Sequence, residues 1–357
     1  MKNALIEPKK ICAKCLMPDT YPGITFNGEG VCNFCLHHRK KEPLGEEPLI
    51  DLLRSKSGNG YDCVLGISGG KDSCYVAYLA KEQFGLRALA VCYDFPFLVD
   101  LARENIKKVC DSLKLDVLYV KSRNNFEYDF QRNHLISLSG TKTTWGQCVF
   151  CHYGIEGVLY NTAIKNNIPF ILSGVTDNEL WNPGNRTRFL LQRVKKLSFG
   201  DFLRFIYYQA KAYLNLMDQR QQFRIPGNSC FNVYRRAVLP ENGPRVIRVF
   251  DYIQWDQALI EQTLKERTGW QKPPRATSWR YDCILEPLLD FTYKQEFGIS
   301  TVGIYLSGLI RAGLISREEA LRVQQHSETR EHLEGSLLRA LDFLKVPANV
   351  RDKYFDN

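Results

Sequence analysis

The fold of this chain is decided by one stretch, Tyr61-Asp62-Cys63-Val64-Leu65-Gly66-Ile67-Ser68-Gly69-Gly70-Lys71-Asp72-Ser73. Its first five residues form a short apolar run typical of a buried strand, and Cys74 to Phe84 favours a helix that ends before Gly85. A strand, a glycine turn and a helix N-terminus in this order bring backbone N–H groups together, and the helix dipole and Lys71 add positive charge. We therefore expect a solvent-facing anion site at the turn, with Asp72 or Ser73 capping the helix.

The turn is not the G-x-x-x-x-G-K-[ST] loop of kinases and GTPases. It resembles the SGG-x-DS pyrophosphate-binding loop of the ATP pyrophosphatases, the PP-loop superfamily, whose members activate an oxygen by adenylation and release pyrophosphate. A plain strand–turn–helix connection is the alternative interpretation. The resemblance implies that Lys71 and Asp72 act in catalysis and that ATP is bound by the six residues of this phosphate loop: Ser68, Gly69, Gly70, Lys71, Asp72 and Ser73.

Length and composition set broad limits. The chain has 357 residues, which exceeds one typical domain. The N-terminus has no apolar signal-peptide core, and no run of about 18 apolar residues occurs, so we expect a cytoplasmic protein without stable membrane insertion. In that compartment the twelve cysteines are expected to be metal ligands, catalytic groups or buried thiols rather than disulfides. The net charge of +9 suits an anionic partner, and nucleotides, nucleotide-sugars and RNA would all satisfy it.

Strands and helices alternate after Asp62. The pattern predicts strands over 86–93 and 116–120, a strand that begins at 170, and a strand over 245–250. It predicts helices over 99–113 and 255–268. Such alternation predicts an α/β fold with a doubly wound parallel sheet, whose ligands bind at the carboxyl ends of the strands.

Two predicted strands end in carboxylates. Asp94 follows one of them and could face the adenosine of ATP, although a carboxylate that only caps a loop explains the pattern equally well. Phe170-Ile171-Leu172-Ser173-Gly174-Val175-Thr176-Asp177 resembles the glycine-plus-acid strand end beside the phosphates in the ATP pyrophosphatases. The resemblance implies that Gly174 lies at the nucleotide and that Asp177 holds Mg²⁺ in catalysis, with Asp72 as a second candidate. Val175 replaces the histidine usual in that superfamily.

The N-terminal segment holds two C-x-x-C pairs, Cys12 with Cys15 and Cys32 with Cys35, joined by a turn-rich connection. This spacing is typical of a four-cysteine zinc ribbon, a segment too small to fold without its metal. An iron site or free thiols are the alternatives. Four thiolates leave no open coordination position, so we expect a structural Zn²⁺.

The domain prediction follows from these patterns. Residues 1–48 form the ribbon and a charged linker, residues 49–297 form the ATP pyrophosphatase domain, and residues 298–357 form a helical region. An insertion over about 185–244 is first basic and then aromatic. We interpret it as a helical pair packed on the core, with a partner-docking or membrane-surface helix as the alternative. Ser316 and Glu319 predict a capped helix in the tail, followed by another over about 331–344.

A second cysteine group begins with Cys148-x-x-Cys151. A lone pair of this kind is often two buried thiols, and a zinc or redox site is another alternative. The pair also resembles that of the tRNA thiolases of the superfamily, in which a C-x-x-C and one distant cysteine hold a 4Fe-4S cluster with one iron open. The resemblance implies that the third ligand follows the strand–helix unit at 246–268. It therefore favours Cys283, with Cys230 as the alternate ligand.

The combination of the ribbon, the SGGKDS loop, the Cys148-x-x-Cys151 pair and Ser278-Trp279-Arg280-Tyr281-Asp282-Cys283 resembles the N-acetyl sugar amidotransferases. Those enzymes act in bacterial surface-polysaccharide and lipopolysaccharide O-antigen biosynthesis. The resemblance implies that ATP with Mg²⁺ adenylates the acetamido oxygen of a nucleotide-linked N-acetylated sugar acid, and that ammonia then displaces AMP to give an acetamidino sugar. Arginines within 185–248 would hold the sugar diphosphate and carboxylate.

Ammonia needs a source. The sequence begins Met1-Lys2 and has no cysteine in a Gly-x-Cys-x-Gly setting, so a separate glutaminase subunit is expected, as in that family. The alternative function is a tRNA thiolase, which would explain the open iron. Against it, the tRNA enzymes with this ribbon usually carry a second ribbon, and no cysteine follows Cys283. We therefore expect no nucleic-acid partner. A non-catalytic ribbon scaffold is the remaining alternative.

Overall fold

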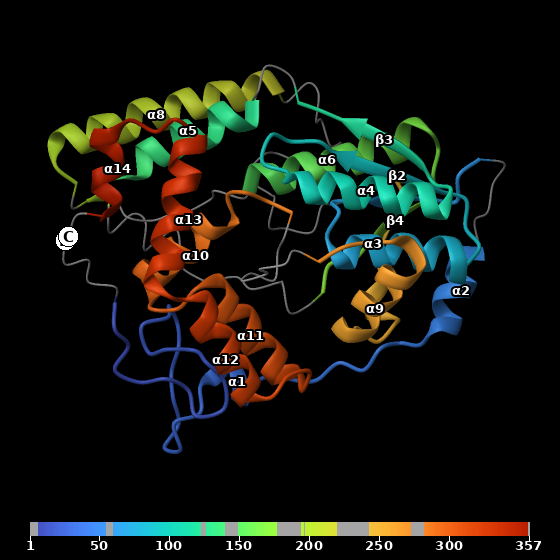
Figure 1. Ribbon diagram of the computed structural model, residues 1–357, viewed down its shortest axis with the longest axis horizontal. Helices are drawn as coiled ribbons and strands as arrows, with labels where there is room; N and C mark the ends of the chain where they lie inside the picture. Colours follow the sequence, from blue (N-terminus) through green and yellow to red (C-terminus); the bar gives the residue numbers. More distant parts are fainter. Residues whose placement is uncertain are drawn as a thin grey trace.

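A parallel five-stranded sheet forms the centre of the protein (Figure 1). This computed structural model describes residues 6–54, 60–122, 126–139, 149–176, 194–195, 197–219, 243–272 and 282–355. The strand order is β3-β2-β1-β4-β5, so the sheet is doubly wound as predicted. The strands are β1 (Cys63–Gly66), β2 (Ala88–Tyr93), β3 (Asp116–Val120), β4 (Phe170–Ser173) and β5 (Arg245–Arg248).

Helices cover both faces of the sheet and form a second layer around its edge. Helices α3, α4 and α9 pack against one another on one face, and α6 packs on β1, β2 and β4. The helices of the described residues are α1 (Asn33–Leu36), α2 (Glu46–Arg54), α3 (Lys71–Tyr78), α4 (Asp100–Leu113), α5 (Phe126–Leu138), α6 (Val149–Lys165), α8 (Phe199–Gln219), α9 (Gln257–Thr268), α10 (Glu286–Phe297), α11 (Thr301–Ala312), α12 (Arg317–Ser327), α13 (Arg330–Phe343) and α14 (Ala348–Phe355).

The order of the strands puts the phosphate loop at a topological switch point. Strand β1 pairs in parallel with β2 on one side and with β4 on the other. The backbone therefore leaves β1 between two strands whose connections run to opposite sides of the sheet. In doubly wound sheets this crevice at the carboxyl ends of the strands is where ligands bind.

Several local predictions are confirmed, and two need correction. The helix predicted over 74–84 is α3 continued by a π-helical turn over Leu79–Gln83, and Gly85 ends it with a positive φ of 62°. The strand predicted over 245–250 ends at Arg248, where a 3₁₀ turn over Val249–Asp251 begins. The N-cap position of α3 is Gly70, which has no side chain to cap the helix. Neither Asp72 nor Ser73 takes the capping role.

The N-terminal ribbon packs against the C-terminal helices. The backbone N–H of Leu16 in the ribbon donates to the Ser307 hydroxyl of α11 at 3.2 Å. The Tyr21 ring lies 5.6 Å from the Phe297 ring at the end of α10. Figure 1 shows the ribbon beneath α11 and α12, away from the sheet. The N-terminal segment is therefore anchored by the C-terminal helices, and the domain boundaries remain a prediction.

The described part of the insertion is one long helix. Helix α8 packs along α5, and its Gln209 amide donates to the Ser137 hydroxyl of α5 at 2.7 Å. Residues 177–193 and 220–242 lie outside the described residues, so the second helix of the predicted pair is untested. None of the described helices combines the length and the hydropathy that a membrane crossing needs.

Gly69 provides a direct test of the architecture. It has a φ of 80°, and a Cβ built on it would lie 2.8 Å from the Cα of Ala102 in α4 and closer still to the Ala102 carbonyl oxygen. Gly69→Ala should lower the free energy of unfolding by about 3 kcal/mol or more, because backbone strain and overlap with backbone atoms add together. Guanidinium unfolding monitored by circular dichroism measures the change.

Gly85→Ala is the matched control. Gly85 also has a positive φ, 62°, but nothing lies within 4 Å of a Cβ built there. This variant should lose only about 1–2 kcal/mol, the cost of the left-handed backbone alone. Equal losses in the two variants would contradict the close approach of α4 to the phosphate loop.

Candidate phosphate and metal sites

The phosphate loop is closed by its own serines. The backbone N–H of Ser68 donates to the Ser73 hydroxyl at 3.2 Å, and that hydroxyl donates to the Gly70 carbonyl at 3.1 Å. The Ser68 hydroxyl lies 3.4 Å from the backbone N–H of Gly70. These bonds span the turn from β1 into α3 and fix its curvature. The loop thus presents the N-terminus of a helix at the switch point, the geometry that binds phosphate groups.

Distant residues hold the loop from behind. The Trp270 indole N–H donates to the Gly69 carbonyl at 2.9 Å, and the Asn105 amide lies 3.4 Å from the same oxygen. Asn105 in turn bonds the backbone of Gln271 in both directions, at 2.8 and 2.9 Å. Trp270 and Asn105 were both missed by the sequence analysis, since neither lies in a recognisable motif. An Asn on the otherwise apolar inner face of an amphipathic helix was the available signal for Asn105.

We expected Lys71 to face solvent, but its side chain is buried. Its side chain is only 3% exposed, and its ammonium pairs with the Asp72 carboxylate at 2.7 Å. The other Asp72 oxygen accepts the indole N–H of Trp255 at 2.7 Å, and the Lys71 ammonium lies 5.4 Å from the centre of that ring. The lysine charge is therefore already balanced in this structure. To contact a phosphate directly, the ammonium has to turn away from Asp72.

A second carboxylate reaches the loop from the C-terminal half of the protein. The Asp282 carboxylate comes within 3.8 Å of the position that a Cβ on Gly70 would take. The Asp282 carbonyl accepts the backbone N–H of Val99 at 3.1 Å, and Cys283 pairs with Leu98 in an antiparallel bridge. This segment is thus tied to the residues that follow β2. Asp282 lies within the Ser278–Cys283 motif, but no pattern in the sequence indicates a role for it at the loop.

The predicted strand-end residues lie in different settings. Asp94 follows β2 as expected, but its carboxylate pairs with Arg103 at 2.8 Å and Lys121 at 3.1 Å. These ion pairs fit the loop-capping interpretation, and contact with adenosine stays a prediction. Gly174 lies against the start of α3, where a Cβ would come 3.0 Å from the Asp72 carbonyl oxygen. Asp177 lies outside the described residues.

The four N-terminal cysteines form a compact cluster. The sulfur atoms of Cys12, Cys15, Cys32 and Cys35 all lie within 4.8 Å of one another and are buried. Two of the separations are 4.0 Å and 3.8 Å. Tetrahedral zinc with bonds of about 2.3 Å needs sulfurs about 3.8 Å apart, so the cluster fits an ion of that size.

The surroundings of this cluster favour thiolates. Three backbone N–H groups, those of Lys14, Cys15 and Cys32, point at the Cys12 sulfur at 3.2 to 3.4 Å. The Arg311 guanidinium lies 3.9 Å from the Cys15 sulfur. Hydrogen bonds from the thiols of Cys32 and Cys35 lower the pKa of Cys15. The donors and the cation offset negative charge on sulfur, as a metal site requires.

The second cysteine group is only partly described, since Cys148 and Cys230 lie outside the described residues. Cys151 lies in the first turn of α6, which precedes the parallel strand β4, so this end of α6 faces the carboxyl edge of the sheet. Cys283 bridges to Leu98, which follows β2 at the same edge. The topology therefore brings both cysteines to the edge that carries the phosphate loop. A three-cysteine cluster remains a proposal.

A buried acid lies beside the second cysteine group. The Tyr93 and Ser122 hydroxyls donate to the carboxylate of Glu127, and burial raises its pKa to about 7. A Cβ on Gly154 of α6 would come 2.7 Å from the Tyr93 ring, so α6 passes directly over this tyrosine. Gln131, one turn after Glu127, donates to the Cys151 sulfur at 3.6 Å. Glu127 and Gln131 of α5 thus lie close to the N-terminal part of α6, which carries Cys151.

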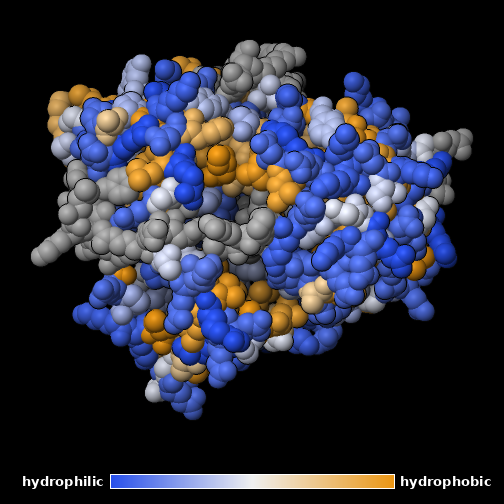
Figure 2. Space-filling view, viewed as in Figure 1, coloured by the Kyte–Doolittle hydropathy of each residue, from blue (hydrophilic) through white to orange (hydrophobic). Residues whose placement is uncertain are grey.

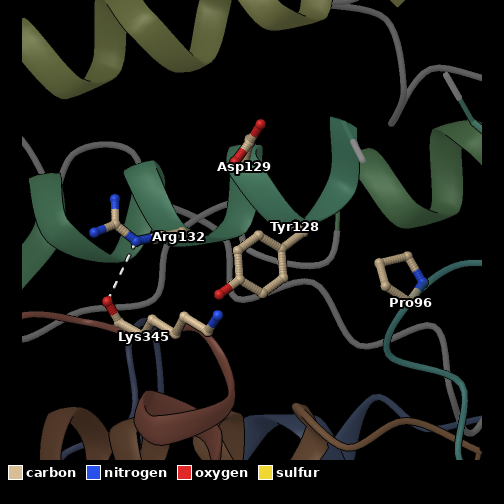
Figure 3. A pocket seen from close by; sticks show the side chains of 5 residues that line it. All are labelled: Pro96, Tyr128, Asp129, Arg132 and Lys345. Atoms are coloured by element: carbon tan, nitrogen blue, oxygen red, sulfur yellow. Dashed lines mark hydrogen bonds between the residues drawn. The ribbon is translucent and has the colours of Figure 1, made fainter. Parts of the chain in front are cut away.

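A separate shallow pocket of about 490 Å³ lies near this region (Figure 3). The Arg132 guanidinium donates to the Lys345 carbonyl at 3.3 Å, and the Tyr128 hydroxyl donates to the Phe343 carbonyl. These bonds join α5 to the segment after α13. No residue of the phosphate loop belongs to the lining, which consists of Pro96, Tyr128, Asp129, Arg132 and Lys345.

Comparison with known proteins agrees with this geometry. Residues 49–132 match the family model described as NAD synthase. This match supports a PP-loop ATP pyrophosphatase fold for the matched residues. The matched residues include the whole phosphate loop and α4, which holds the loop through Asn105.

Curated relatives match only part of this chain. An uncharacterised protein of Methanocaldococcus jannaschii is 37% identical over 112 residues, covering 31% of this chain and 35% of the relative. A tRNA-specific 2-thiouridylase of Fusobacterium nucleatum is 32% identical over 114 residues, covering 31% of this chain and 32% of the relative. A glutamine-hydrolysing GMP synthase of Chlamydia muridarum is 34% identical over 84 residues, covering 24% of this chain and 16% of the relative. The matched region thus spans well under half the length of these relatives.

Two solved structures cover more of the protein with weaker similarity. An NMN synthetase from Francisella tularensis matches with a TM-score of 0.38 at 14% identity, over 82% of this chain and 93% of that one. A U34-tRNA thiolase from Methanococcus maripaludis, described with its 4Fe-4S cluster, matches with a TM-score of 0.37 at 16% identity, over 91% of both proteins. At such low TM-scores, these two similarities add nothing to the assignment.

Glu127 should make stability depend on pH. Its pKa rises from 4.5 to about 7 on folding, so the folded state binds the proton more tightly than the unfolded state. The stabilisation is complete below about pH 4.5 and is lost as the pH rises through about 7. Its full size is on the order of 3 kcal/mol. Urea unfolding of the wild type and of Glu127→Gln, compared between pH 5 and pH 8, should show a smaller decline in the variant.

The control is Glu104→Gln, whose side chain is exposed on α4. It should leave the pH dependence unchanged. A Glu127→Gln variant that declines as steeply as the wild type would mean that Glu127 does not titrate in this range.

Proposed function

We propose that this protein is an ATP-dependent amidotransferase that converts the acetamido group of a nucleotide-linked N-acetylated sugar acid into an acetamidino group. The observation that carries the ATP chemistry is the closed phosphate loop at the switch point of the sheet, with Lys71 at the first residue of its helix. The choice of substrate rests on the combination of motifs that resembles the N-acetyl sugar amidotransferases. One of these motifs ends in Asp282 and Cys283, which lie beside the phosphate loop. A surface polysaccharide such as O-antigen is the proposed destination of the product.

The proposed reaction has two steps. The acetamido oxygen attacks the α-phosphorus of ATP, a P–O bond forms, and pyrophosphate leaves. Ammonia then adds to the activated carbon, the C–O bond breaks, AMP leaves with the oxygen, and the nitrogen loses its extra proton to solvent. The phosphate-loop N–H groups and the ammonium of Lys71 would stabilise the departing pyrophosphate.

The carboxylates near the loop support a role for Mg²⁺. Asp282 and Asp72 both lie beside a loop built to bind anions, and carboxylate oxygens are ligands that Mg²⁺ prefers. When bound, Mg²⁺ would neutralise the triphosphate charge. We therefore propose Asp282 as a further candidate ligand with Asp72, beside the earlier candidate Asp177. In this proposal Lys71 turns from Asp72 to the phosphates as nucleotide binds, while Trp255 continues to hold Asp72.

The proposed partners and metals follow from the same resemblance. A separate glutaminase subunit would supply ammonia. The cysteines at positions 12, 15, 32 and 35 would hold a structural Zn²⁺. A 4Fe-4S cluster would be held by Cys148, Cys151 and Cys283, with Cys230 as the alternate ligand.

A tRNA thiolase is the second candidate function. Its support is the identity with a tRNA-specific 2-thiouridylase and the 27% identity with a probable sulfurtransferase of Methanocaldococcus jannaschii over 167 residues. The 34% identity with a glutamine-hydrolysing GMP synthase over 84 residues favours nitrogen transfer. Similarity over less than half of this chain does not choose between the acceptors, so the acceptor has to be tested directly.

Turnover should require a sugar and ammonium. Pyrophosphate and AMP should form only when a nucleotide-linked N-acetylated sugar acid is present, and free ammonium should support product formation without a partner. Glutamine alone should not, since the proposal assigns glutamine hydrolysis to a separate subunit. Pyrophosphate release measured against sugar and tRNA substrates checks this. Adenylation of tRNA with no turnover on any sugar would favour the thiolase.

Two variants connect this activity to the phosphate loop. Lys71→Gln keeps a hydrogen-bond donor for Asp72 in the buried pair and should lower turnover by about 10²-fold or more. Asp282→Asn should raise the Mg²⁺ concentration needed for half-maximal rate. Glu104→Gln, on the exposed face of α4, should behave like the wild type.

Metal content should divide between the two cysteine groups. Protein purified without oxygen should hold one zinc and, separately, an oxygen-sensitive iron–sulfur chromophore. Cys32→Ser should lose zinc and keep the chromophore, whereas Cys283→Ser should keep zinc and lose the chromophore. Each variant is the control for the other. Loss of colour in Cys230→Ser instead would transfer the third ligand to Cys230, and an iron-free wild type would remove the cluster.

A further inference from the structure

We propose that the outer face of α8 binds the surface of an anionic lipid membrane. The face is defined by six large apolar side chains that remain exposed although the helix packs along α5: Phe199, Phe202, Leu203, Ile206, Tyr207 and Leu214. Phe199 is 78% exposed and Tyr207 is 61% exposed. Figure 1 shows α8 along the outer edge of the molecule, and Figure 2 shows apolar surface at that edge.

The exposed residues form one continuous stripe. At about 100° of rotation per residue, the six side chains fall within an arc of about 140°. Gln209, which reaches His134 and Ser137 of α5, lies just beyond one edge of the stripe, and Asp201 lies on the opposite side of the helix. The six apolar side chains thus stay exposed even though other residues of α8 attach the helix to α5. An apolar arc beside a charged face is the pattern of helices that lie in the membrane interface.

The sequence in and before α8 is rich in basic residues, which favours an anionic surface. Between positions 185 and 214 the sequence holds seven basic residues and one acid, Asp201. The Asp201 carboxylate is paired with Arg204 at 2.8 Å and with Lys353 of α14, on the side of the helix away from the stripe. Lys195 and Lys211 are exposed. Basic residues near an anionic leaflet each contribute about 1 kcal/mol to binding.

The composition of the stripe favours lipid over a protein partner. Interfaces between proteins carry about one hydrogen bond per 100–200 Å² with a polar rim. The Tyr207 hydroxyl is the one polar side-chain group in the stripe as defined. A single convex helix with aromatic and aliphatic side chains fits a layer of acyl chains and headgroups. Binding of this kind is peripheral and reversible, which agrees with the expectation that the protein does not insert stably.

Flotation of the full-length protein with vesicles tests the proposal. Vesicles of equal parts phosphatidylglycerol and phosphatidylcholine should bind the wild type, and pure phosphatidylcholine vesicles should bind it much more weakly. Leu203→Glu should weaken binding at least about tenfold, because it removes a buried leucine from the complex. Leu259→Glu on α9 is the matched control, since Leu203 and Leu259 are both 52% exposed. It should bind as the wild type does.

Circular dichroism and thermal unfolding confirm that each variant is folded, and Phe199→Ser at the most exposed position replaces Leu203→Glu if that variant is unstable. A wild type that ignores anionic vesicles overturns the proposal, as does a Leu203→Glu protein that binds unchanged. Equal binding to pure phosphatidylcholine overturns the role of charge. A dimer that Leu203→Glu splits, with no vesicle binding, would instead assign the stripe to self-association.

Discussion

The close approach of α4 to Gly69 is the constraint on which the phosphate site depends. No side chain fits between them, and the backbone of Gly69 needs a positive φ. This approach lets Asn105 of α4 reach the Gly69 carbonyl, which Trp270 also holds from the segment after α9. Two segments that are distant from the loop in sequence, α4 and the residues after α9, therefore hold one peptide of the loop. An anion site built from backbone N–H groups is effective only when those groups are held in place before the ligand arrives.

Electrostatics at the site are balanced before any nucleotide binds. The buried pair of Lys71 and Asp72 costs less than a lone buried ammonium would, because each charge compensates the other. The Trp255 indole N–H gives Asp72 a partner that is independent of Lys71. In the proposed reaction, phosphate would replace the Asp72 carboxylate beside the lysine. Asp282 adds negative charge near the same loop, and a divalent cation bound with the triphosphate would compensate that charge.

The C-terminal half of the protein connects the N-terminal four-cysteine ribbon to the sheet. Helices α10 and α11 hold the ribbon through Ser307 and Phe297, and the segment just before α10 bridges to Leu98 after β2. The ribbon itself lies away from the phosphate loop, so its cysteines act on the fold and do not contact the reacting groups. Helix α8 packs against α5, and its apolar stripe remains exposed. The exposed stripe of α8 thus lies on a different element from the phosphate loop, which stands between β1 and α3.

The sequence by itself determined the doubly wound sheet, the phosphate loop and the four-cysteine cluster. The apolar runs, the glycine turn before a helix and the two C-x-x-C pairs are each specified within a few tens of residues, and the alternation of strands and helices predicts a doubly wound sheet. Only the tertiary structure decided the partners of that loop: Trp255, Trp270, Asn105 and Asp282 come from other segments, and no spacing rule connects them to it. It also decided that Lys71 is buried, since exposure depends on what packs over a residue and not on its neighbours in sequence.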